Sequence, residues 1–204
     1  MKLKRLRIYS CSHGLLGKTS NNLWQEENTW GYHLANKYGL EYINKSKAGY
    51  SNFHIFRTVY NDLKELDSND LVFVQWSHTN RAWALDQPSV LPLNNDKLSK
   101  IYFKNLYNDL QEINKVIGYT LILDKLINNF VFNFFEGESY FKGYSSETWP
   151  LIAQMPNYLN VNDRAMNHIV DKKKFPCMHF DTDGHQEIAD LYSKKLEIYL
   201  SKNT

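Results

Sequence analysis

The sequence has few cysteines, no long apolar run and almost no excess charge of either sign. Its 204 residues include two cysteines, Cys11 and Cys177, which exclude the disulfide framework of a small secreted domain and match no zinc-finger spacing. The 24 basic and 22 acidic side chains leave a formal net charge of +2. Because no basic stripe stands out among them, we expect no nucleic-acid partner.

The apolar residues are spread over short runs. None approaches the length that spans a membrane, and the basic start "MKLKRLRIYS" is not followed by the apolar segment of a signal peptide. We therefore expect a cytoplasmic protein with no membrane partner. No repeat, linker or low-complexity tract divides the chain, so we expect residues 1–204 to form a single domain. The sequence favours no particular oligomeric state.

Short apolar runs alternate with segments whose apolar residues recur at helical spacing. The predicted strands are 4–10, 40–46, 70–76, 129–135 and a short 158–162. The predicted helices are 28–39, 51–66, about 98–128 with Gly118 as a possible bend, and 181–200. This alternation predicts an α/β fold, a flavodoxin-like three-layer α/β/α sandwich with a mainly parallel sheet of about five strands.

Particular residues support these boundaries. We expect Asn28 or Thr29 to cap the first helix, Ser51 the second, and Asp181 or Asp183 the last, because their side-chain oxygens can accept from free N–H groups. The continuous apolar run "DLVFVQW" is typical of a strand that is buried on both faces of a sheet. We expect the core to include Ile8, Val72, Val74 and Phe132.

In a parallel sheet, ligands bind at the carboxyl ends of the strands. Three polar segments follow predicted strands there: "SCSHG", "KAGYSN" and "SHTNR". The candidate site residues, including two from the C-terminal region, are Cys11, Ser12, His13, Gly49, Asn52, Ser77, His78, Asn80, Arg81, His179 and His185. A hydroxyl nucleophile beside a histidine base and N–H donors is the minimum for acyl transfer.

Several of these residues carry two interpretations. Cys11 is either a thiolate nucleophile or a small buried side chain, and His13 is either a substrate contact or a solvated loop residue. Gly49 either brings a backbone N–H close to a substrate oxygen or only forms a turn. Asn80 either binds that oxygen or caps the next segment, and Arg81 holds either a substrate anion or a neighbouring carboxylate.

The order of the motifs resembles that of the SGNH/GDSL hydrolase family over most of the chain. "IYSCSHG" is similar to the family's first block, with Ser10-Cys11-Ser12 in place of Gly-Asp-Ser. "INKSKAGYSN" resembles the second block, with Gly49 at the oxyanion glycine, and "LVFVQWSHTNR" the third, with Asn80 nearest to the oxyanion asparagine. "MHFDTDGHQEIA" resembles the last block, with His179 at the catalytic histidine.

The resemblance implies a serine esterase. Ser12 would be the nucleophile and His179 the base, and the oxyanion would be bound by Ser12, Gly49 and Asn80. The reaction would pass through an acyl-enzyme and need no cofactor or metal. The implied substrate is a small-molecule or carbohydrate ester, such as a sugar carrying O-acetyl groups. Two alternatives stay open: a catalytically silent domain that binds a glycan or a protein, and an O-acyltransferase that uses the same residues.

The last block departs from the family pattern. Pro176 stands where the family places an aspartate three residues before its histidine. We therefore expect the Nδ1 of His179 to be bonded to a main-chain carbonyl or water. The candidates to replace this aspartate are Asp163, Asp171, Asp181 and Asp183. His185 is the alternative base, although its place in a helical turn disfavours it.

Two further patterns bear on ligand binding. Histidines 13, 78, 179 and 185 raise a metal hypothesis, but no HxH or HExxH spacing supports it. Aromatic residues over the site would either stack on sugar rings or form the core of a lid: Trp83, Tyr140, Phe141, Tyr144 and Trp149.

Overall fold

The computed structural model describes residues 2–14, 17–18, 24–81, 100, 104, 107–163 and 180–203. Its centre is a sheet of parallel strands, β1 (Arg5–Tyr9), β4 (Glu41–Asn44), β5 (Asp70–Trp76) and β6 (Phe130–Phe134). The strands lie in the order β4-β1-β5-β6. The predicted α/β sandwich is confirmed, and the described residues form four strands of the sheet instead of about five. The segment predicted as a fifth strand contributes an isolated parallel bridge between Tyr158 and Phe132.

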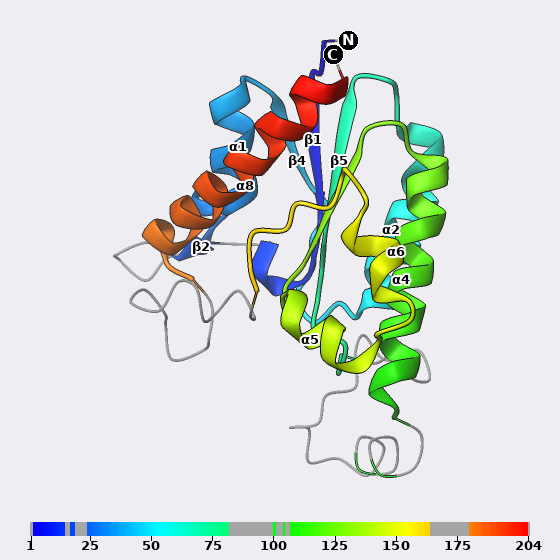
Figure 1. Cartoon of the computed structure of the whole chain (residues 1–204). Helices are drawn as coiled ribbons and strands as arrows, with labels where there is room; N and C mark the ends of the chain where they lie inside the picture. Colours follow the sequence, from blue (N-terminus) through cyan, green and yellow to red (C-terminus); the bar gives the residue numbers. More distant parts are fainter. Residues whose placement is uncertain are drawn as a thin grey trace.

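Helices cover both faces of the sheet (Figure 1). The helices α1 (Trp30–Tyr38) and α8 (Thr182–Asn203) lie on one face, and α2 (Asn52–Asp62), α4 (Asp109–Leu126) and α6 (Trp149–Ala153) lie on the other. The short α5 (Glu138–Tyr144) lies near the carboxyl end of β6. The remaining elements are the 3-10 helices Ser12–Gly14, Glu26–Asn28 and Leu63–Glu65, and the antiparallel pair β2 (Gly17–Lys18) and β3 (Trp24–Gln25).

Alternate residues of the strands supply two separate cores. On the α1/α8 side, Ile8 and Phe73 pack with Trp30 and Tyr192. On the α2/α4 side, the side chains come from Val72, Val74, Phe132, Ile55, Val59 and Ile113. The predicted core residues Ile8, Val72, Val74 and Phe132 are all 0% exposed. The prediction for β5 is also confirmed, because every residue from Asp70 to Trp76 is buried.

The helix ends agree with the predicted capping chemistry in most cases. The Thr29 side chain accepts from the Tyr32 N–H at the start of α1, and Gly39 ends that helix with φ 62°. Asp181 Oδ1 accepts from the Gly184 N–H, 2.8 Å away, in the first turn of α8. Ser51 precedes α2 as predicted, but its hydroxyl makes no capping bond to the backbone.

Two predicted boundaries need correction. Of the helix predicted for 98–128, the structure describes α4 from Asp109 to Leu126, and Asn108 caps its start by accepting from the Gln111 N–H. Most of 98–106 lies outside the described residues. The segment after β6, for which no helix was predicted, contains α5 and α6, whose Phe141 and Trp149 are buried against the sheet.

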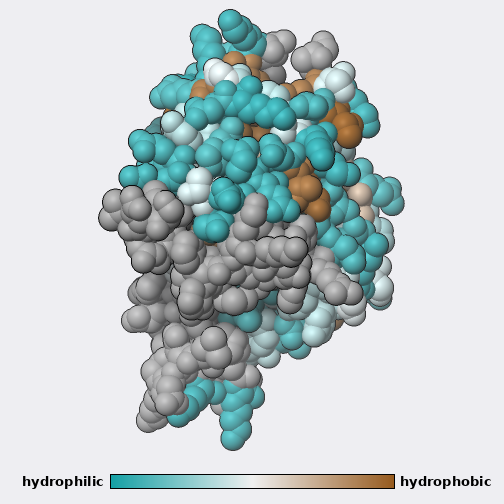
Figure 2. Space-filling model, turned by 90° about the vertical axis from the view of Figure 1, so that its left-hand side faces the viewer, coloured by the Kyte–Doolittle hydropathy of each residue, from teal (hydrophilic) through white to brown (hydrophobic). Residues whose placement is uncertain are grey.

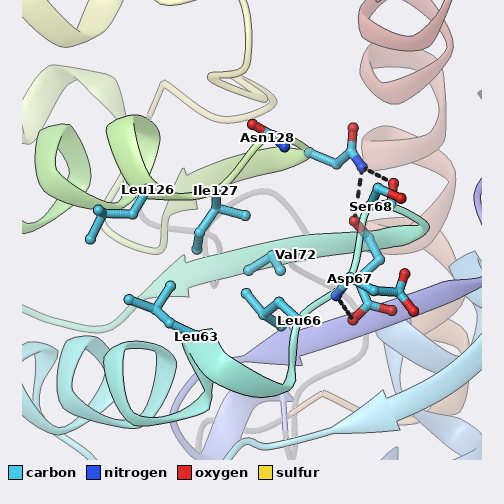
Figure 3. Close-up of a pocket in the computed structure, with 10 residues that line it drawn as sticks. Leu63, Leu66, Asp67, Ser68, Val72, Leu126, Ile127 and Asn128 are labelled. Carbon is cyan, nitrogen blue, oxygen red and sulfur yellow. Dashed lines mark hydrogen bonds between the residues drawn. The ribbon is translucent and has the colours of Figure 1, made fainter.

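The described surface is largely polar on one side (Figure 2), and a cavity lies at the opposite edge of the sheet from the candidate loops. On the side of the molecule that lies on the left in Figure 1, the coloured residues are mainly hydrophilic, with small apolar areas among them (Figure 2). None of the helices in the described ranges combines the length and apolarity needed to cross a membrane. A cavity of about 220 Å³ lies at the amino ends of β5 and β6 (Figure 3). There the Asn129 side-chain amide donates hydrogen bonds to the main-chain carbonyls of Ser68 and Asp70. The amide group therefore has a structural role.

Candidate functional site

The carboxyl edge of the sheet brings the three predicted loops together. The Lys47 N–H donates to the Ser10 carbonyl at 3.2 Å, and the Asn44 amide donates to the Gly14 carbonyl at 3.0 Å. These bonds join the loop after β1 to the loop after β4. Asn52, which begins α2, joins the second loop to the loop after β5. The predicted convergence of these three segments is therefore present in the fold.

The loop after β1 exposes Ser12 and hides Cys11. Ser12 begins a 3-10 turn that is closed by a 3.1 Å bond from the Gly14 N–H to the Cys11 carbonyl. Cys11 is 1% exposed, whereas Ser12 is partly exposed. A Cβ at Gly14 would lie 2.7 Å from the Ser10 Cβ, so this turn needs glycine. Burial disfavours the thiol as nucleophile, because the thiolate needs a polar, accessible setting.

The loop after β4 has the backbone of a tight turn. Gly49 has φ 77°, a conformation that side chains rarely adopt. Asn52 is 5% exposed, and its amide is used for structure. Its Oδ1 accepts from the Ser77 N–H at 2.7 Å, and its Nδ2 donates to the Ser77 carbonyl at 3.2 Å. Asn52 therefore positions the third loop, and the oxyanion role of Gly49 stays a prediction.

The loop after β5 is tied to a carboxylate that the sequence analysis did not select. His78 Nδ1 lies 3.3 Å from Glu136 Oε1, and Glu136 Oε2 accepts from the Thr79 N–H at 3.0 Å. Because a carboxylate only accepts, this contact places the proton of a neutral His78 ring on Nδ1. The Glu136 side chain is 10% exposed and that of His78 is 26% exposed. The signal available in the sequence was an acid directly after the predicted strand 129–135.

His13, in the first loop, packs against the residue that follows β6 and against the third loop. Its ring is 4% exposed and stacks on Phe135 with the centroids 4.1 Å apart. The His78 ring lies edge-on at 6.1 Å, and Phe180 lies at 5.8 Å. This packing replaces the solvated-loop interpretation of His13 with a buried one. Ser77 is also buried, and Asn80 and Arg81 are partly exposed at the end of the same loop.

A second cluster lies beside Glu136. The Thr79 hydroxyl is 2.8 Å from the Tyr140 hydroxyl, which donates to Asp109 Oδ1 at 2.7 Å. Burial raises the pKa of Tyr140, so this hydroxyl remains protonated and can donate. Of the predicted aromatic group, Phe141 and Trp149 are buried and Tyr144 is 49% exposed. The core interpretation therefore holds for the first two, and Trp83 lies outside the described residues.

A chain of buried polar side chains runs from β1 across the sheet. The Ser10 hydroxyl donates to Gln75 Oε1 at 3.1 Å, and Gln75 Nε2 donates to the Tyr192 hydroxyl at 2.8 Å. Tyr192 in turn donates to Asn133 Oδ1 at 2.9 Å, and Asn133 Nδ2 donates to Asn162 Oδ1 at 3.0 Å. All five side chains belong to buried residues. Ser10 stands two positions before Ser12, so this network fixes the start of the candidate loop.

The C-terminal candidates are only partly described. His179, Pro176, Asp171 and Cys177 lie outside the described residues. His185 is 1% exposed, and its Nδ1 accepts from the Trp30 N–H at 3.2 Å. A triad histidine needs a proton on Nδ1 and a free Nε2, which is the opposite arrangement. Within the described ranges, no group of three or more His, Cys, Asp or Glu side chains is placed to hold a metal ion.

Solved structures with the same arrangement identify the fold. This is the fold of the SGNH/GDSL hydrolases. The psychrotrophic esterase EstA from Pseudoalteromonas sp. is similar with a TM-score of 0.58 and 13% identity over 97% of this chain and 99% of that one. A putative lipolytic protein of the G-D-S-L family from Desulfitobacterium hafniense has a TM-score of 0.56 and 11% identity, over 94% and 99% of the two chains.

A longer protein shares the SGNH/GDSL fold. The carbohydrate esterase family 2 enzyme of Corynascus thermopiles (Myceliophthora fergusii) has a TM-score of 0.60 and 11% identity, over 97% of this chain and 67% of that chain. Comparison of the sequence with family profiles and with curated proteins gives no match.

Proposed function

We propose that this protein is a serine esterase that hydrolyses small acyl esters, with Ser12 as its nucleophile. The observation that carries the proposal is the place of Ser12. It is a partly exposed hydroxyl on the first turn at the carboxyl edge of an SGNH/GDSL fold. The similar solved structures named above include two esterases. A carbohydrate ester is the preferred substrate class, because an acetyl xylan esterase from Butyrivibrio proteoclasticus also has a similar fold.

The proposed reaction has two steps. The Ser12 Oγ attacks the acyl carbon while its proton passes to the base, which the family resemblance assigns to His179. The oxyanion is bound by backbone N–H groups of Ser12 and Gly49 and by the Asn80 amide. The alcohol leaves with the proton from the histidine, and the acyl group stays on Ser12. Water that is deprotonated by the same histidine then releases the acid and restores the serine.

The test is hydrolysis of a short-chain aryl ester by the wild type and by Ser12→Ala. Removing a catalytic nucleophile costs about 10⁴-fold or more in kcat, and far-ultraviolet circular dichroism shows whether the variant is folded. Cys11→Ala is the matched control, since its side chain is adjacent but buried. Labelling by an alkyl phosphonate, located by mass spectrometry, should modify Ser12. Full activity in folded Ser12→Ala would refute the proposal.

The same assays separate the two other functions. A silent glycan-binding domain would hydrolyse no ester and would take up no phosphonate. An O-acyltransferase would be labelled at Ser12, but adding an acceptor sugar would divert the acyl group from water to the sugar hydroxyl. An esterase should give free acid in proportion to the alcohol released, whether or not the sugar is present.

A further inference from the structure

Arg81 lies at the end of the third loop, beside a cavity on the α2/α4 side of the sheet. Its backbone N–H donates to the His78 carbonyl at 3.2 Å, which anchors it to the candidate site. The cavity has a volume of about 230 Å³ and lies between the start of α2 and the first half of α4. Its polar lining consists of Ser51, Asn52, Arg81, Glu112 and Lys115.

The charges around this cavity do not balance. Glu112 is already paired with Lys115, with the Lys115 Nζ 2.6 Å from its Oε1. Arg81 forms no ion pair with any carboxylate in the described part of the chain. Its Nη1 is shielded from solvent and has no hydrogen-bond partner there. A donor that is buried without an acceptor is costly, and a charged one more so.

This result favours the substrate-anion interpretation of Arg81. A neighbouring carboxylate would have neutralised the guanidinium, and the described residues supply none. The first turn of α2 adds partial positive charge at the same place, because Ser51, Asn52 and Phe53 also line the cavity. The Ser51 hydroxyl does not cap this helix, since it is bonded to His54 Nδ1 at 2.9 Å.

We propose that this cavity binds an anionic group, a carboxylate or a phosphate, that is carried by the ester substrate. The planar guanidinium of Arg81 binds oxygens of the anion, while Lys115 stays paired with Glu112 and neutralises that carboxylate. Asn52 lines the cavity and also holds the third loop through Ser77. The anion subsite and the candidate catalytic loops therefore lie at the same carboxyl edge of the sheet. This inference rests on the proposed esterase function and specifies its substrate class.

The experiment compares charged and neutral esters of the same shape. The substrates are para-acetoxybenzoate, para-acetoxyphenyl phosphate and the neutral methyl ester of the benzoate. The measured quantity is the ratio of kcat/KM for each anionic ester to kcat/KM for the neutral one. Arg81→Gln should lower this ratio about 10- to 100-fold, the range expected for a lost charge-assisted hydrogen bond. Arg81→Lys should lower it less, because the charge remains but the planar fork is lost.

Arg57→Gln is the matched control, since Arg57 is an exposed arginine of α2, the helix whose start lines the cavity, and is not part of the lining itself. It removes the same charge and should leave the ratio within about twofold. An unchanged ratio in folded Arg81→Gln would overturn the proposal. An equal fall in Arg57→Gln would also overturn it, because the effect would then be general charge attraction.

A binding measurement keeps the subsite separate from the esterase reaction. The full chain with the Ser12→Ala substitution is titrated calorimetrically with para-acetoxybenzoate and with inorganic phosphate. This variant is used so that binding is measured without turnover. The double variant Ser12→Ala/Arg81→Gln is compared with Ser12→Ala alone. Anion binding that is about 10-fold or more weaker in the double variant supports the subsite, even if the wild type hydrolyses nothing. Hydrolysis of the neutral ester without any measurable anion binding would leave the esterase standing and refute the subsite.

Discussion

Replacing Tyr192 with phenylalanine tests the buried polar network behind the Ser12 loop. The Tyr192 hydroxyl accepts from Gln75 Nε2 at 2.8 Å and donates to Asn133 Oδ1 at 2.9 Å. Burial raises the pKa of Tyr192, so the hydroxyl is a neutral donor throughout the working pH range. The phenylalanine ring fills the same space, and the substitution therefore removes two hydrogen bonds without creating a large cavity.

The magnitude follows from the two groups that lose their partner. Gln75 is 1% exposed and Asn133 is 0% exposed, so water cannot replace the hydroxyl without moving the core. Each buried polar group left unsatisfied costs about 1–3 kcal/mol. Allowing for partial relaxation, we expect Tyr192→Phe to lower the free energy of unfolding by about 2–4 kcal/mol. That is a large share of the stability of a typical domain.

The assay is urea denaturation, followed by both tryptophan fluorescence and far-ultraviolet circular dichroism. Tyr60→Phe is the control, since Tyr60 is 54% exposed, and it should change stability by no more than about 0.5 kcal/mol. The double variant Gln75→Leu/Tyr192→Phe should cost less than the sum of the single changes by about 1 kcal/mol. A loss below about 0.5 kcal/mol for Tyr192→Phe, with an unchanged denaturant slope, would refute the reasoning.

Three further predictions concern single positions. Gly14→Ala should destabilise the protein by about 1–3 kcal/mol in the same urea assay, because the new Cβ would lie 2.7 Å from the Ser10 Cβ. At Gly118 a Cβ meets nothing within 4 Å, so Gly118→Ala should stabilise the protein by about 0.5–1 kcal/mol. Burial lowers the pKa of His33 in the folded state, so the free energy of unfolding should fall as the pH drops below about 6.5. His33→Gln should make this pH dependence less steep, and an equal steepness in the variant and the wild type would contradict the prediction. Asp181→Asn should change kcat less than about tenfold, since Asn also caps helices; a loss near 10⁴-fold would instead make Asp181 a triad acid.

The strands and the helix caps were predictable because local rules determine them. The seven residues of β5 are a continuous apolar run, and a strand covered by helices on both faces requires that pattern. Thr29 and Asp181 cap helices through atoms only three residues away. The short α5 and α6 were missed because Gly and Pro near them suggested turns. Their stability comes from contacts between Phe141, Trp149 and the sheet, which no local pattern records.

The position of the candidate site was predictable, but the hydrogen-bond partners of its residues were not. Strand ends reveal which loops share an edge, and the loops at Ser12, Gly49 and His78 do. The partner of His78 is Glu136, 58 positions away, and it becomes a neighbour only because β5 and β6 pair in parallel. The bond from Gln75 to Tyr192 spans 117 positions and depends on how α8 packs on the sheet. Such partners require the register of the fold, which one sequence does not supply.

Four of the described carboxylates near the carboxyl edge already hold partners, and this bears on both the base and Arg81. They are Asp109 with Tyr107 and Tyr140, Glu112 with Lys115, Glu136 with His78 and Thr79, and Asp181 with the Gly184 N–H. An acid for His179 from this set would have to give up a bond that holds a loop or a helix. The absence of an aspartate at position 176 therefore predicts a base steadied by main-chain oxygen or water, and a slower reaction, since the imidazolium would lack a counter-charge. The same distribution leaves Arg81 without a carboxylate among the described residues, which is the reason to look for its counter-charge on the substrate.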